Sequence, residues 1–156
     1  MKKWIIIILI VCCIIIWRGC SIYQSAMEPV KVSEQKATKI ALEETSLQTI
    51  KENYTYYGTS AYLVVIGSNE DGDEMIVWIP EEKGEILTRL QSEGITEKEA
   101  VAIVREEREV KEIRSVKLGI EDEIPIWEII YIGSDNRLTY HKLYFETGKY
   151  RNSIKP

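Results

Sequence analysis

The sequence predicts an α+β protein of two tandem modules, each with one helix packed on an antiparallel sheet of three or four strands, after an N-terminal transmembrane helix. Three observations indicate this: an apolar run of fourteen residues near the N-terminus, a segment that recurs at an offset of 63 residues, and a hydrophobic period that shortens toward 2 after each copy. The predicted divisions are the cytoplasmic tip and anchor (1–23), a tether (24–31), the first module (32–92) and the second module (93–156).

Length and charge exclude several classes of protein. The chain has 156 residues, 45% hydrophobic and 29% charged, which suits one or two small packed domains and excludes a large multidomain enzyme. The first 18 residues contain three basic residues and no acid, so the remaining 17 basic residues face all 25 acidic ones. This negative excess argues against a nucleic-acid partner, because phosphate contacts require clustered lysine and arginine.

The apolar run extends from Trp4 to Trp17 without a charged residue. At about 1.5 Å per residue it is about 21 Å long, short of the ~30 Å hydrocarbon core, so length does not distinguish a spanning helix from a signal peptide. The residues around Tyr23–Ala26 make a poor cleavage site, and Arg18 before Cys20 disfavours lipidation. We therefore expect an uncleaved anchor, although cleavage stays open.

The charges beside the anchor predict its orientation. Lys2 and Lys3 lie on the short N-terminal side, which the positive-inside rule places in the cytoplasm. The expected location is therefore the cell membrane, with a single pass and an extracytoplasmic C-terminal part. The three cysteines all lie in or beside the anchor, so the modules have no disulfide; a role for Cys20 stays open.

The repeated segment predicts one helix in each module. Ser33–Glu44 aligns with Thr96–Glu107, and each copy begins with a hydroxyl residue followed by an acid, as helix N-termini prefer. Thr96 and Glu99 also form a capping box. Apolar residues at near-helical spacing indicate one buried face per helix: Ala37, Ile40, Ala41 and Leu47 in the first copy, and Ala100, Ile103, Val104 and Val110 in the second.

Alternating apolar residues predict a meander after each helix. The expected strands are Tyr54–Gly58, Ala61–Gly67 and Glu74–Ile79 in the first module, and Ser115–Leu118, Ile126–Gly133 and Leu138–Phe145 in the second. The triplets Ile66–Ser68 and Ile132–Ser134 match. A unit of roughly 60 residues buries only about 60% of its unfolded surface, so we expect the two modules to share an interface.

Residue patterns for catalysis are missing from the sequence. His141 is the single histidine, in a predicted strand, and neither a nucleophile motif nor a phosphate-binding loop occurs. The acidic run Glu70–Glu74 lacks the alternating ligands of a calcium loop, so it reads as a hairpin tip, and Glu121–Glu123 reads as a solvated turn. Trp78 and Trp127 read as core residues at non-equivalent positions. We predict no catalytic, cofactor-binding or metal-binding residue.

Several short motifs, in their order, carry a resemblance to a known family. These are Ser21–Met27 after the anchor, Gly94–Ala100, Trp127–Ile129 and the closing Phe145–Lys149. Together with the length and the two-copy layout, they resemble the TseB-like family of cell-wall elongation regulators. Each module also resembles the PepSY and cystatin-like folds.

The resemblance implies a non-catalytic extracytoplasmic protein that associates with a class B penicillin-binding protein, a peptidoglycan transpeptidase, and supports cell-wall elongation. No small-molecule substrate or cofactor is implied, and no residue receives a role by analogy. The PepSY likeness keeps a second function open, the inhibition or modulation of secreted proteases, and an enzyme of unknown type is a third. Exposed strand edges are plausible docking surfaces for a protein partner.

Overall fold

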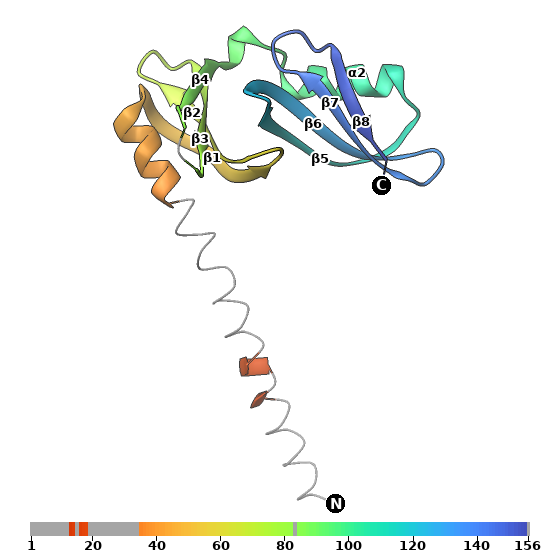
Figure 1. Cartoon of the computed structure of the whole chain (residues 1–156), viewed down its shortest axis with the longest axis horizontal. Coiled ribbons are helices and arrows are strands. Elements are labelled where there is room, and N and C mark those ends of the chain that lie inside the picture. The colour runs from red at the N-terminus through yellow and green to blue at the C-terminus, as the bar shows by residue number, and fades with distance from the viewer. Residues whose placement is uncertain (1–12, 15, 19–34, 83, 156) are drawn as a thin grey trace, which may run out of the picture. The chain divides into compact units, whose positions relative to one another are not determined.

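The computed structural model describes residues 13–14, 16–18, 35–82 and 84–155 (Figure 1). Most of the predicted anchor and all of the tether lie outside these residues, and no helix within them is long and apolar enough to cross a membrane. Contacts within the chain separate two compact units, Met1–Lys36 and Ala37–Pro156. The second unit contains all of the sheets described below.

Two four-stranded antiparallel sheets follow one another along the described part of the second unit (Figure 1). The first sheet has the order β1 (Leu47–Tyr57), β2 (Ala61–Asn69), β3 (Glu74–Pro80) and β4 (Leu87–Leu90), and the second has β5 (Val110–Glu121), β6 (Ile124–Gly133), β7 (Leu138–Tyr144) and β8 (Tyr150–Ile154). Residues 37–44 are helical before β1, and the short 3-10 helix η1 (Gln91–Glu93) and helix α2 (Glu97–Glu107) connect the sheets. The predicted α+β class with two antiparallel sheets is confirmed.

The first strand of each sheet is longer than predicted. Leu47 and Val110, which the sequence pattern assigns to helix faces, instead begin β1 and β5. Each strand has two register shifts close to its start, between Leu47 and Thr49 and between Ile50 and Glu52 in β1. Because each bulge inserts a residue and interrupts the alternation of faces, the period of 2 is not visible there. The short edge strands β4 and β8 were not predicted, since neither contains a buried residue.

The bulges establish which residues of the two modules are equivalent. Those of β5 lie 63 residues after those of β1, which agrees with the predicted offset. Beyond the bulges, Glu52 pairs with Ile66 and Ser115 pairs with Ile130, so the second strands correspond at an offset of 64. The predicted match of Ile66–Ser68 with Ile132–Ser134 is therefore wrong by two residues.

The first sheet has two buried faces. Along β2 and β3, one set of alternate residues packs with Ala37 and Ala41 of the helical segment in a small core; this set comprises Leu63, Val65, Met75, Val77 and Ile79. The other set, which includes Val64, Ile76 and Trp78, belongs to a larger core shared with the second module. A sheet buried on both faces gives nearly continuous apolar runs, as in Met75–Ile79.

Helix α2 begins with the predicted capping box. The Glu99 amide donates to the Thr96 hydroxyl at 3.3 Å, and the Thr96 amide donates to the Glu99 carboxylate at 2.7 Å. Hydrogen bonds from Thr96 lower the pKa of Glu99. Ala100 and Val104 of α2 are buried in the larger core, as predicted.

Tyrosines of β1 hold the two modules together. The Tyr54 hydroxyl accepts a hydrogen bond from the Leu118 amide at 2.9 Å and donates to the Leu118 carbonyl at 3.3 Å. The Tyr56 ring lies against Gly119, where a Cβ atom would come within 2.4 Å of it. Trp78 contacts Phe145 edge to face, with ring centroids 6.2 Å apart. The predicted shared interface is therefore confirmed, and it positions the groove described next.

Candidate binding groove between the two modules

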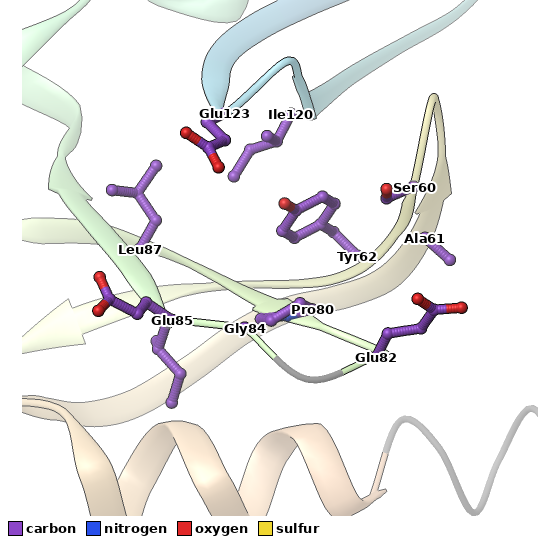
Figure 2. A pocket seen from close by; sticks show the side chains of 11 residues that line it. Ser60, Ala61, Tyr62, Pro80, Glu82, Gly84, Glu85, Leu87, Ile120 and Glu123 are labelled. Atoms are coloured by element: carbon purple, nitrogen blue, oxygen red, sulfur yellow. The ribbon is translucent and has the colours of Figure 1, made fainter.

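A groove of about 590 Å³ lies where the first sheet meets the β5–β6 hairpin (Figure 2). In Figure 2 the Tyr62 side chain extends from β2 toward Ile120 of the second module. Apolar groups contributed by both modules line the hollow: Ala61, Tyr62, Pro80, Ile86, Leu87 and Ile120. The site therefore depends on the contact between the modules, and neither module forms it alone.

Three carboxylates surround the apolar part of the groove. Glu82 and Glu85 belong to the segment between β3 and β4, and Glu123 belongs to the turn between β5 and β6. All three residues are exposed, and the described lining residues include neither lysine nor arginine. A hollow with acidic walls produces a negative potential that attracts cationic groups.

The turn that carries Glu123 has an unusual backbone. Asp122 and Glu123 are the two residues between β5 and β6, and both have positive φ angles, 51° and 65°. A two-residue hairpin of the type I′ class requires such angles because they match the twist of the strands. Asp122 forms an ion pair with Arg151 of β8. The turn thus presents Glu123 at the mouth of the groove.

A second hollow of about 410 Å³ is also lined by residues of this hairpin and shares Glu123 with the first. Its lining includes Ile124, Pro125 and Tyr144 from the second module. Arg89 of β4 also lines it, with its Nε atom 3.9 Å from a Glu146 carboxylate oxygen. This hollow therefore has mixed charge, whereas the first has acidic walls.

A buried ion cluster includes Glu121, the residue just before the turn between β5 and β6. Lys142 of β7 contacts the carboxylates of Glu121 and, at 3.5 Å, Glu128. Arg151 lies 3.7 Å from Glu121, and the four side chains are only 8–13% exposed. The Tyr56 hydroxyl donates to Glu128 at 3.3 Å. Burial and the charge of Glu128 raise the pKa of Tyr56, so this hydroxyl stays protonated. The expectation that Glu121 lies in a solvated turn is wrong. Glu121 is buried at the end of β5, where this cluster neutralises its charge.

The sequence analysis missed this cluster, although a signal for it exists. Glu128 and Lys142 are single charged residues within the apolar strands β6 and β7, and they pair directly in the register. Opposite charges that face each other across two strands stabilise a sheet. The pairing becomes visible only when the register is known.

The other residues weighed from the sequence lie away from the groove lining. His141 is fully buried between the rings of Tyr131 and Tyr150, with centroids at 6.4 and 5.0 Å. Burial, and then the charge of Arg108, lower the pKa of His141. Trp78 and Trp127 are core residues, as expected, on the non-equivalent strands β3 and β6.

The acidic run Glu70–Glu74 forms a tight hairpin. The Gly72 amide donates to the Asn69 carbonyl at 3.1 Å, and Gly72 has a φ angle of 84°, which favours glycine. Within the residues that the structure describes, no group of three or more histidine, cysteine, aspartate or glutamate side chains is arranged to hold a metal ion.

Comparisons with known proteins agree on one family. Residues 36–80 match the model of the cell wall elongation regulator TseB-like domain. The chain is 32% identical over 137 residues, 87% of its length, to a probable cell wall elongation regulator TseB of Bacillus subtilis (strain 168), of which it covers 85%. The structure is similar to that of the YpmB protein from Bacillus subtilis, with a TM-score of 0.74 and 31% identity over 78% of this chain and 96% of that chain.

Proposed function

The chain belongs to the family of TseB-like cell wall elongation regulators, and from this membership we propose that it regulates elongation by binding a class B penicillin-binding protein. The similarity to a regulator over 87% of the chain is the observation that carries the regulatory role. The proposed role is non-catalytic: the chain acts on another enzyme, as the name of its relative as a regulator suggests.

The groove between the modules supports a protein partner. Its apolar lining and acidic walls suit a polypeptide segment, because protein interfaces combine a buried apolar centre with a polar rim. The proposed membrane anchor in residues 1–23 strengthens this interaction. Tethering both proteins to one membrane raises their effective concentration, so modest affinity between them is sufficient.

Crosslinking in membranes tests the proposal. The full chain and a class B penicillin-binding protein are produced together, crosslinked in intact membranes and analysed by mass spectrometry. We expect crosslinked peptides that join residues 35–155 to the penicillin-binding protein, together with an intact N-terminal peptide. An abundant, unrelated single-pass membrane protein is the control. The proposal is contradicted if crosslinks to the penicillin-binding protein are no more frequent than crosslinks to the control protein. Turnover of a cell-envelope substrate by the purified chain would also contradict it.

A further inference from the structure

We propose that the groove at the module junction binds an extended segment of a partner protein in which an apolar side chain lies next to lysine or arginine. This inference rests on the proposed function, because the penicillin-binding protein supplies the segment. The groove is the one lined by Tyr62, Leu87 and Ile120, with Glu82, Glu85 and Glu123 on its walls.

The apolar part of the segment follows from the lining of the groove. Tyr62, Ile86 and Leu87 are only partly buried, so they retain apolar surface that a partner side chain can cover. The volume of about 590 Å³ lies within the range of about 300–1,000 Å³ that is usual for binding pockets. It is therefore large enough for one anchoring side chain and its neighbours.

The basic part of the segment follows from the charges. Glu82 and Glu85 come from the first module and Glu123 from the second, so the carboxylates lie on both sides of the hollow (Figure 2). The whole chain also carries a net charge of −5. Lysine or arginine beside the apolar anchor would meet these carboxylates, and complementary charge favours both the encounter and the selection of the partner.

Recognition through side chains, and not through strand addition, follows from the state of the nearby strand edges. At β4, the Thr88 carbonyl accepts a hydrogen bond from the Arg89 guanidinium at 2.8 Å, and the Leu90 amide donates to Glu93 at 2.7 Å. At β5, the Tyr54 hydroxyl occupies the amide and carbonyl of Leu118. These four backbone groups already have partners within the chain and are not free to pair with an added strand, which favours recognition through side chains.

Binding measurements with charge-reversed variants test the inference. The full chain in detergent micelles is titrated with a purified class B penicillin-binding protein at several salt concentrations. We expect Glu85→Lys with Glu123→Lys to weaken binding about tenfold at low salt, where exposed charges are least screened. The double variant should also reduce the salt dependence of the affinity, because it removes the rim charges that salt screens. Tyr62→Ala removes an aromatic side chain from the apolar lining of the groove, so it should weaken binding at every salt concentration.

The matched control is Glu44→Lys with Glu106→Lys, which changes the net charge equally at exposed residues outside the groove. This control should bind as the wild type does. If the wild type binds and the Glu85/Glu123 variant binds equally well, the groove is not the contact site and the inference is wrong, while the proposed function stands. If the wild type does not bind, the proposed function fails, and this inference fails with it.

Discussion

The two modules use the same sheet face in different ways. Val64 pairs with Trp78 in the first module, and at the equivalent positions of the second module Glu128 pairs with Lys142. Val64 and Trp78 are fully buried in the core that the modules share. Glu128 and Lys142 instead belong to an ion cluster that Tyr56 of the first module partly covers.

This difference shows how a duplicated unit acquires two roles. The face of the first module is apolar because the second module covers it, and it supplies the contact between them. The face of the second module retains charge and half-buried apolar residues such as Ile130, Tyr140 and Tyr144. The first module therefore uses this face for the interface, and the second uses it to support the turn that carries Glu123 to the groove.

The largest expected effect is at the apolar centre of the first module. Trp78→Ala removes a fully buried indole that contacts Phe145, and we expect a loss of about 3–5 kcal/mol in the free energy of unfolding. Urea denaturation followed by circular dichroism measures the loss. Trp78→Phe, which keeps most of the apolar volume, should cost clearly less; equal costs for the two variants would contradict an origin of the loss in the apolar volume removed.

The ionic centre of the second module should respond differently to removal and to replacement. Lys142→Ala leaves Glu121 and Glu128 without their common partner, which should cost about 3 kcal/mol. Lys142→Met with Glu128→Leu removes one charge of each sign and leaves Glu121 with Arg151. This double variant should regain most of the lost stability in the same denaturation experiment, and a loss as large as that of Lys142→Ala would contradict a purely electrostatic explanation.

The hydroxyl of Tyr54 allows a smaller and more specific test of the junction. Tyr54→Phe leaves the Leu118 amide and carbonyl without their partner and should cost about 1–2 kcal/mol. Tyr57→Phe is the matched control, since Tyr57 is 72% exposed, and it should change stability by less than about 0.5 kcal/mol. Similar values for the two variants would mean that the Tyr54 bonds do not hold the modules together.

The smallest effect concerns acid stability on the helix side of the second sheet. Because burial lowers the pKa of His141 in the folded protein, the unfolded state binds more protons below its own pKa of about 6.5. Stability should therefore fall as the pH decreases from about 6.5 toward the lowered folded pKa. Stability measured across this range should decline less steeply for His141→Phe than for the wild type, and parallel curves would assign the decline to other groups.

The sequence predicts the repeated features well and the module-specific features poorly. The start of α2 and the central strands were predicted because Thr96, Glu99 and the alternating apolar residues act locally, whereas the predicted start of the first helix at Ser33 lies outside the described residues. The beginnings of β1 and β5 were missed because bulges interrupt their periodicity. The groove and the burial of Glu121 depend on residues far apart in the chain, such as Tyr62 with Ile120 and Glu121 with Lys142, and no local pattern encodes such pairs.

Hydrogen exchange during urea unfolding tests most directly whether the two modules form one structural unit. Peptides from β2 and β3 are compared with peptides from β6 and β7 in the full chain in detergent micelles. The shared core and the Tyr54 contacts predict that both sets lose protection at the same urea concentration with the same steepness. If the second module keeps its protection after the first has lost it, the modules are independent and the junction groove is not a stable site.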